Sequence, residues 1–290
     1  MRILVLGSSG LIGHTVVREL KSFFDIFGTL HKSKHQYKNS MFLDKMYVDN
    51  VDVNNFELLK EVIVGLHPEV ILNCTGITRR KITSDNILEV ISVNSCFPHR
   101  LAILARDLNI RIIHFSTDCV FDGKHGNYTE SSLTTAEDLY GRTKALGEIM
   151  YRNTLTIRSS FIGQELFDKT ELLEWFLAQK GKHIKGYKNT LYSGVSTIYM
   201  AKVVKEIILY HKELNGLYNL APENPISKYD LLCIARDAFG IDVKIIPDEI
   251  HHHRPTLNSA KLRGAINIKV PNWEEMMEEL AKHGSNINYH

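Results

Sequence analysis

Short apolar runs alternate with helical stripes of apolar residues through about the first 160 positions. A short apolar run suits a buried strand, and apolar residues every three or four positions suit a helix. The runs predict strands at residues 2–6, 25–30, 46–48, 69–74, 110–115 and 155–158. Strands that are apolar on both faces are typical of a parallel sheet with helices on both sides. This part of the chain therefore predicts an α/β fold with a Rossmann-like, doubly wound parallel sheet.

The alternation loosens in the second half of the chain. Helical patterns are expected at 171–180, 197–210, 227–240 and 274–282, short strands at 216–220 and 243–246, and a loop at 186–194. Ser227 followed by Asp230 resembles a capping box at a helix start. We predict a main domain at residues 1–160 and a smaller, partly interleaved C-terminal domain at 161–290.

A glycine-rich turn follows the first strand, and a helical stripe follows the turn. In this context a dinucleotide pyrophosphate is expected to bind at Gly7, Ser9, Gly10, Leu11, Ile12 and Gly13. Gly7 permits the tight turn, Gly10 lets backbone N–H groups approach the pyrophosphate, and Gly13 lets the helix pack close to the strand. The spacing is G-x-x-G-x-x-G, so an ordinary strand-to-helix turn is the alternative.

The segment after the second strand favours NADP over NAD. No Asp or Glu lies between Ile26 and Leu43, where an NAD-specific site usually has an acid for the ribose 2′-hydroxyl. The basic sequence H-K-S-K-H occupies 31–35, and Lys32 is the best candidate for the 2′-phosphate, with a solvated basic loop as the alternative. NADP is therefore the expected cofactor, with NAD as the second choice. Other residues near strand ends are expected to line the cofactor: Asp52, Val53, Cys74, Thr75, Gly76 and Ser116.

Hydroxyl, phenol and ammonium groups follow the fifth strand. Ser116 and Thr117 stand at its end, and Tyr140 precedes Lys144 by four positions at the start of a helical segment. Residues four apart share one face of a helix, so the ammonium can acidify a phenol whose ordinary pKa is ~10. Such a set can deliver a proton to a carbonyl. The alternative is a helix-start aromatic with a surface lysine.

The sequences S-T-D-C-V-F-D-G at 116–123 and Y-G-R-T-K at 140–144, with the glycine turn, resemble the extended short-chain dehydrogenase/reductases, and most closely the dTDP-4-dehydrorhamnose reductase family. The resemblance implies an NAD(P)H-dependent reductase of the C4 ketone of a nucleotide-linked 4-keto-6-deoxy sugar. It implies that the catalytic residues are Thr117, Tyr140 and Lys144. It also implies cofactor contacts from Tyr140 and Lys144 in the N-terminal domain, and a substrate-binding C-terminal domain. The expected substrate contacts are Thr117, Asp118, Phe161 and Arg254, the last of which is alternatively part of a solvated loop.

Three departures from the family pattern fall at expected substrate contacts. Cys119 replaces a tyrosine, Phe161 stands where a tryptophan is common, and residues 76–81 lack the usual acidic residues. An N-acetylated, UDP-linked 4-keto-6-deoxy sugar is therefore a rival substrate. Some members of the family use Mg²⁺ at a dimer contact, but those ligands have no match here and we predict no metal.

Two alternatives belong to other functional classes. Some relatives of this family bind the dinucleotide and act as regulatory subunits of another enzyme, without needing the catalytic acid. An epimerase of the same fold would recycle its cofactor, whereas a reductase consumes it.

Composition narrows the partners. The 290 residues are 44% hydrophobic and 23% charged with a formal charge of +2, so neither nucleic acid nor a membrane surface is an expected partner. Four widely spaced cysteines indicate reduced thiols and a cytoplasmic protein. The adjacent His251, His252 and His253 cannot easily converge on one metal ion. Helices at 86–106 and 137–151 could pair in a homodimer, but their apolar faces would serve the sheet equally well.

Overall fold

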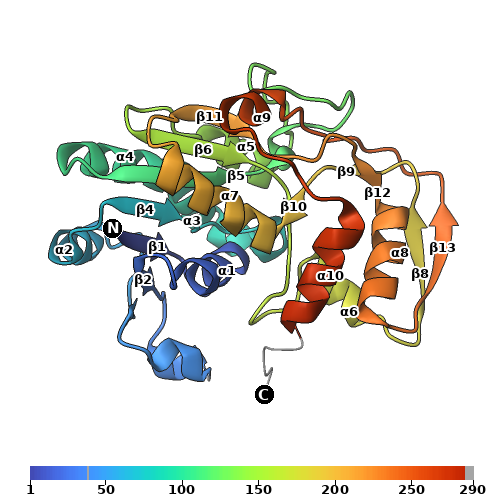
Figure 1. Ribbon diagram of the computed structural model, residues 1–290, viewed down its shortest axis with the longest axis horizontal. Helices are drawn as coiled ribbons and strands as arrows, with labels where there is room; N and C mark the ends of the chain where they lie inside the picture. The colour runs from blue at the N-terminus through green and yellow to red at the C-terminus, as the bar shows by residue number, and fades with distance from the viewer. Residues whose placement is uncertain (38, 285–290) are drawn as a thin grey trace. The chain divides into compact units, whose positions relative to one another are not determined.

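A computed structural model describes residues 1–37 and 39–284, and it contains a seven-stranded sheet in the order β11-β6-β5-β4-β1-β2-β3 (Figure 1). The strands are β1 (Arg2–Leu6), β2 (Asp25–Thr29), β3 (Tyr47–Val48), β4 (Val70–Asn73), β5 (Arg111–Ser116), β6 (Thr154–Arg158) and β11 (Gly216–Asn219). The pairs β1–β2, β1–β4, β2–β3 and β4–β5 run parallel. The order reverses at β1, which confirms the predicted doubly wound α/β fold.

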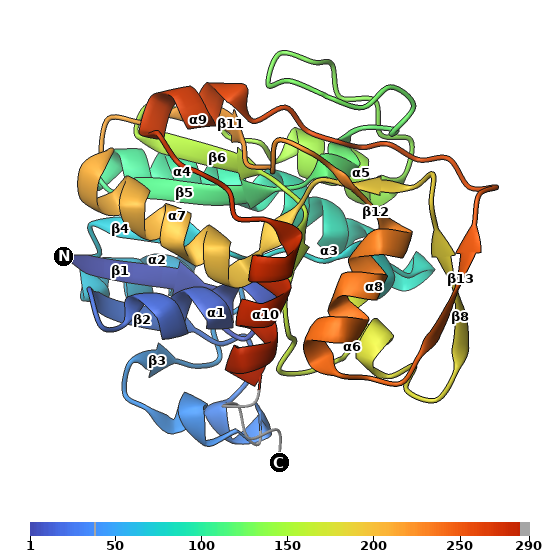
Figure 2. The same ribbon diagram turned by 45° about the vertical axis from the view of Figure 1, so that its right-hand side comes forward.

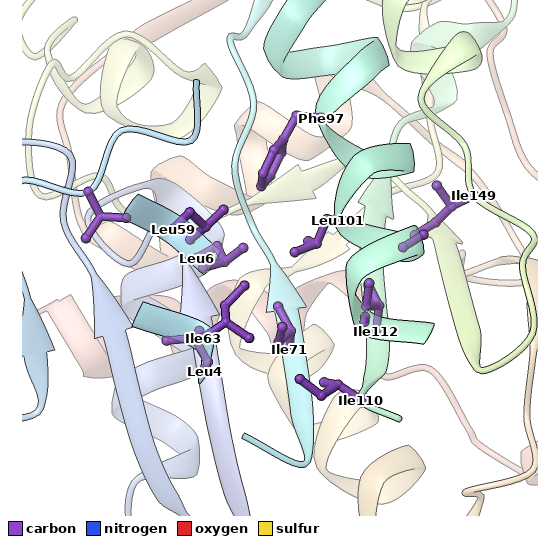
Figure 3. Close-up of a cluster of buried hydrophobic side chains, with 13 residues drawn as sticks. Leu4, Leu6, Leu59, Ile63, Ile71, Phe97, Leu101, Ile110, Ile112 and Ile149 are labelled. Carbon is purple, nitrogen blue, oxygen red and sulfur yellow. The ribbon is translucent and has the colours of Figure 1, made fainter. Parts of the chain in front are cut away.

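Helices cover both faces of this sheet. Leu4 and Leu6 of β1 point toward α2 (Phe56–Leu66) and α4 (Phe97–Asp107), where they join a buried cluster with Leu59, Ile63 and Leu101 (Figure 3). Alternate residues of a strand face opposite sides, so Ile3 and Val5 lie on the other face, the face of α1 (Leu11–Leu20). The glycine turn at the carboxyl end of β1 is thereby anchored from both sides.

The long helical pattern at 86–106 forms two helices joined by a wider turn. They are α3 (Ile87–Ile91), the π-helical turn η5 (Ser92–Cys96) and α4. Pro98 has no N–H group for the carbonyl of Asn94, so the regular helical ladder cannot pass this point. By length and hydropathy alone Ser84–Asp107 could cross a membrane, but Leu101 and Phe97 within it belong to the buried cluster.

The described chain divides into two compact units. Unit 1 comprises Met1–Ser116, Glu137–Ile157 and Leu209–Leu217, and unit 2 comprises Thr117–Ala136, Arg158–Ile208 and Tyr218–His290, of which residues 218–284 are described. Both units are built from separate segments. The expected boundary at residue 160 concerns functional domains and stays a prediction.

Unit 2 contains small sheets and several helices (Figure 2). β8 (His183–Tyr187) pairs in parallel with β13 (Lys244–Asp248), and β9 (Leu191–Tyr192) pairs with β12 (Ile226–Ser227). The expected loop at 186–194 is therefore wrong in part, because β8 ends and β9 lies within it. One further helix, α5 (Leu139–Leu146), belongs to unit 1. The other helices and strands beyond α4 are β7 (Phe161–Ile162), α6 (Leu172–Leu177), β10 (Val195–Ser196), α7 (Thr197–Tyr210), α8 (Lys228–Phe239), α9 (Ala260–Ile266) and α10 (Trp273–Gly284). The cap predicted at Ser227 is confirmed, since its hydroxyl accepts the backbone N–H of Asp230 at 3.0 Å.

Candidate functional site

The glycine turn lies beside the end of β4. Gly7 has a φ of +75°, and a Cβ on it would lie 3.2 Å from the carbonyl oxygen of Cys74. A Cβ on Gly13 would overlap the Gly7 carbonyl, so α1 approaches β1 this closely only with glycine there. Gly10 caps α1 without a side-chain bond, and the first helical turn contains no acidic residue. The N–H groups at this helix start therefore fit a pyrophosphate. Ser9, Leu11 and Ile12 are half-buried around it.

Thr29, at the end of β2, fixes the conformation of this turn. Its side-chain oxygen accepts the Gly7 N–H at 3.2 Å, and its carbonyl accepts the Ser8 N–H and hydroxyl at 3.0 and 2.7 Å. Ser8, which makes two of these bonds, is fully buried. The turn is thus held by the protein itself, which reduces the ordering that a ligand must impose.

The end of β4 carries a buried polar chain. Asn73 Oδ1 accepts the N–H and hydroxyl of Thr75 at 3.2 and 2.6 Å, while Asn73 Nδ2 lies 3.1 Å from His114 Nδ1. An amide nitrogen can only donate, so His114 Nδ1 accepts. Burial lowers the pKa of His114 well below its ordinary value, so its imidazole is neutral. Burial also raises the pKa of the Cys74 thiol, which argues against a nucleophilic thiolate. The network shapes the 74–76 segment expected to line the cofactor.

The helix that carries Tyr140 begins with a side-chain cap. Asp138 accepts the Gly141 N–H at 3.1 Å through one oxygen and an Arg79 N–H at 2.8 Å through the other. Tyr140 follows in the first turn of α5 and is half-buried. Residue 79 belongs to the basic segment after β4, so this ion pair joins that segment to the start of α5.

Lys144 is buried one turn beyond Tyr140. The residue is 5% exposed, and its ammonium donates to the Phe115 carbonyl at 2.8 Å. Burial lowers the pKa of Lys144 from 10.5 to about 8, while Glu148 and Cys74 raise it. A Cβ on Gly76 would lie 4.0 Å from this nitrogen. The charge therefore lies next to the strand end expected to meet the cofactor.

Asn94 is a functional candidate that the sequence did not reveal. Its Oδ1 accepts the Ile77 N–H and its Nδ2 donates to the Ile77 carbonyl, both at 2.9 Å. The backbone that Asn94 holds lies 17 residues away along the chain. Gly147 packs against the Asn94 carbonyl so closely that a Cβ would overlap it. Asn94 thus connects the segment after β4, the turn η5 and the end of α5.

Ser116 is expected to contact the cofactor, and the structure turns its hydroxyl to Glu148. The Ser116 hydroxyl donates to Glu148 Oε1 at 2.7 Å and the residue is 2% exposed. Glu148 also raises the pKa of Lys144. Ser116 therefore positions a carboxylate near the lysine, and its direct cofactor contact stays a prediction.

The expected substrate residues belong to unit 2, which Thr117 begins directly after Ser116. The Thr117 hydroxyl accepts the Cys119 N–H at 3.1 Å and donates to Asp118 Oδ1 at 3.2 Å. Thr117 and Asp118 are both buried. Phe161 is half-buried in β7, and Arg254 is exposed, with its N–H on the Gly123 carbonyl at 2.7 Å.

Lys32, Asp52 and Val53 follow β2 and β3. Lys32 has an exposed side chain, and its N–H donates to the Tyr37 hydroxyl at 3.1 Å. Asp52 Oδ1 accepts the Asn54 N–H at 2.9 Å, so this carboxylate shapes the turn into α2. Val53 packs against the buried cluster of unit 1. Their cofactor contacts stay predictions.

Two surface hollows of unit 1 lie at the opposite, amino edge of the sheet. One includes Asp25 and Ile26 at the start of β2, and the other includes Asn109 and Asn153 just before β5 and β6. Ligands of doubly wound sheets bind at the carboxyl edge, so neither hollow belongs to this site. Across residues 1–37 and 39–284, no three His, Cys, Asp or Glu side chains are grouped to hold a metal ion.

Comparisons with known proteins agree with this architecture. A family model described as the RmlD substrate binding domain matches residues 1–285. A probable low-salt glycan biosynthesis reductase, Agl14, from Haloferax volcanii is 24% identical over 97% of each chain. Methionine adenosyltransferase 2 subunit beta from Xenopus laevis is 24% identical over 83% of this chain and 72% of that one. A crystal structure of dTDP-4-dehydrorhamnose reductase from Bacillus anthracis in complex with NADP has a TM-score of 0.81 at 17% identity, covering 97% of this chain and 99% of that chain. That likeness shows a shared fold.

Proposed function

Because the chain belongs to the RmlD substrate binding domain family, we propose that it is an NADP(H)-dependent reductase of the C4 ketone of a nucleotide-linked 4-keto-6-deoxy sugar. NAD(H) is the alternative cofactor. The names of the Haloferax volcanii and Bacillus anthracis relatives support a reductase, and the latter was crystallised with NADP. The free, widely spaced cysteines support a cytoplasmic location.

Binding of the cofactor would use unit 1. The turn at 7–13 and the start of α1 would hold the pyrophosphate, and residues 74–76 would lie along the dinucleotide. When bound, the reduced nicotinamide supplies the hydride for the ketone carbon. The rigid bonds from Thr29 to the turn and from Asn94 to residue 77 keep both surfaces in place.

Proton delivery would use Tyr140 and Lys144. The phenol donates its hydrogen to the ketone oxygen, and the nearby ammonium stabilises the phenolate that remains. Thr117 would orient the ketone through its hydroxyl, which must then give up its bond to Asp118. Asp118 would be left to accept a sugar hydroxyl.

The burial of Lys144 is the observation that supports this proposal most. Burial holds its pKa at about 8, so the charged form costs about 3 kcal/mol at pH 7. A methionine would fill a similar volume without the cost of burying a charge. The ammonium instead donates to the Phe115 carbonyl at the carboxyl end of β5, the edge where such sheets bind ligands.

Tyr140→Phe tests the assignment of the acid. We expect turnover of a nucleotide 4-keto-6-deoxy sugar to fall by about 100-fold or more, because general acids contribute that much, while NADPH binding stays within twofold. Tyr151→Phe is the matched control, since it removes a phenol that bonds to His99 in the same unit. Near-normal turnover by Tyr140→Phe with NADPH still bound would show that the assignment is wrong.

The substrate class is tested with a panel of sugars. Cys119, Phe161 and the basic segment at 76–81 differ from the family pattern, so a UDP-linked, N-acetylated sugar competes with the dTDP-linked one. Steady-state kcat/KM for both sugars, with NADPH in excess, distinguishes them. Turnover without net NADPH oxidation would favour an epimerase.

A regulatory subunit is the second candidate function, because methionine adenosyltransferase 2 subunit beta is among the relatives. Such a protein needs the glycine turn but no acid. Stoichiometric NADPH binding without oxidation across the whole sugar panel would support this candidate.

A further inference from the structure

Tyr140 stands in the first turn of a short helix. α5 has eight residues, and a helix of this length is marginal in isolation, so other contacts must hold its start. Asp138 provides one of them, because its Oδ1 accepts the Gly141 N–H at 3.1 Å. The position of the Tyr140 phenol therefore depends on how firmly this cap is held.

Buried side chains hold the same turn within unit 1. The Thr143 hydroxyl lies 2.8 Å from the Leu139 carbonyl and 3.0 Å from the Tyr140 carbonyl. It also accepts an N–H of the Asn94 side chain at 3.4 Å. That side chain in turn binds both backbone groups of Ile77 at 2.9 Å. The backbone of Tyr140 is thus linked to the segment after β4, next to the residues expected to line the cofactor.

Arg79 makes a second link between the same two parts. It follows Ile77 by two residues, and its Nη2 donates to Asp138 Oδ2 at 2.8 Å. The Arg79 side chain is 57% exposed and the Asp138 side chain is 44% exposed. The segment after β4 and the start of α5 are therefore joined twice, by a buried connection through Asn94 and by an exposed ion pair.

The exposure of this ion pair limits what it contributes to the fold. Exposed pairs add little to the free energy of unfolding, because water screens the charges and the side chains lose freedom. A small energy still matters where a group must be aligned, since reaction rates depend steeply on alignment. We propose that Arg79 is a positioning residue for Tyr140, which through the Asp138 cap keeps the phenol aligned with the nicotinamide and the ketone. The kinetic part of this inference rests on the proposed reductase function.

Steady-state kinetics of the full-length protein, with NADPH and a 4-keto-6-deoxy sugar nucleotide varied in turn, tests this role. We expect Arg79→Met to lower kcat about three- to fivefold, the change in population that an exposed ion pair can produce, and to leave KM within about twofold. Asp138→Asn keeps a side chain that can cap α5 but removes its charge, so it should cause the same loss. Reduced stability alone cannot lower kcat while the protein stays folded, which thermal unfolding verifies.

Matched variants separate positioning from other roles. The double variant Arg79→Met/Asp138→Asn should lose no more than either single one, because both changes break one contact. Arg79→Lys keeps the charge and should recover most of kcat. Arg106→Met removes an ion pair of similar exposure at the opposite edge of the sheet and should leave kcat unchanged. An unchanged kcat in Arg79→Met, a rise in KM alone, or additive losses in the double variant would each overturn the inference.

A fluorine probe tests the hold on Tyr140 without substrate. With 3-fluorotyrosine introduced at position 140, we expect one narrow fluorine resonance when Arg79 is present. Arg79→Met should broaden or split it, because the first turn of α5 loses one of its links, whereas Arg106→Met should leave it unchanged. An unchanged resonance in Arg79→Met would overturn the inference. If wild-type protein reduces no sugar, the reductase proposal fails, and the fluorine spectrum still decides whether Arg79 positions Tyr140.

Discussion

Replacing Lys144 by methionine tests whether the buried ammonium lowers the stability of the fold and is nevertheless needed for the reaction. Methionine keeps most of the buried volume and removes the charge. At pH 7 the charged form costs the fold about 3 kcal/mol, because burial lowers the pKa of Lys144 from 10.5 to about 8. The lost bond to the Phe115 carbonyl offsets about 1–3 kcal/mol of the expected gain. We therefore expect Lys144→Met to be no less stable than wild type at pH 7, yet inactive as a reductase.

The pH dependence of stability gives the sharper result. The folded pKa lies below the unfolded one, so the unfolded chain binds more protons between about pH 8 and pH 10.5 and wild type gains stability as pH rises. Integrated from pH 7 to pH 9.5, this gain is about 2 kcal/mol relative to Lys144→Met. Urea unfolding at both pH values measures it, with Lys60→Met on the exposed face of α2 as the control. If the difference in the free energy of unfolding between wild type and Lys144→Met stays constant with pH, the burial of a charged lysine is refuted.

Three further predictions concern other residues of unit 1. Asn94→Leu should lower the free energy of unfolding by about 1–3 kcal/mol, because two backbone polar groups of Ile77 lose their partner. It should also lower the rate of NADPH oxidation. Urea titration measures the first effect and absorbance the second. Glu148→Gln should move the alkaline limb of the kcat profile to lower pH, because Glu148 raises the pKa of Lys144; a limb that stays in place would count against that coupling. Gly13→Ala should lose NADPH binding and stability together, since its methyl group overlaps a carbonyl of the glycine turn, and calorimetry with thermal unfolding would detect both.

Local patterns account for the parts of the fold that the sequence predicted. The apolar run at 2–6, the turn at 7–13 and the stripe of α1 are neighbours in the chain, so periodicity and glycine spacing sufficed to place them. The cap at Ser227 was predicted for the same reason. In unit 2, the sequence predicted no strand at β8. His183 and Lys185 are exposed on this strand, and its partner β13 lies far along the chain.

Long-range contacts account for the parts of the site that the sequence did not predict. Asn94 reaches Ile77 only because the helix widens at η5, and no spacing rule encodes that partner. The hydroxyls of Ser9 and Tyr37 meet across 28 positions, a contact that no local pattern encodes. Sequence could name Tyr140 and Lys144 from their spacing, but the burial that sets the pKa of Lys144 is a property of the fold.

Hydride transfer to a sugar ketone is the central claim, and isotope transfer measures it most directly. The protein would be incubated with NADPH that carries deuterium at the transferable C4 position and with each 4-keto-6-deoxy sugar nucleotide, and the product analysed by mass spectrometry and NMR. We predict one deuterium at the sugar C4, with one NADPH oxidised per product, and no such product from Tyr140→Phe. A wild-type product that forms without deuterium at C4, or no product from any sugar while NADPH stays bound and unoxidised, would contradict the account.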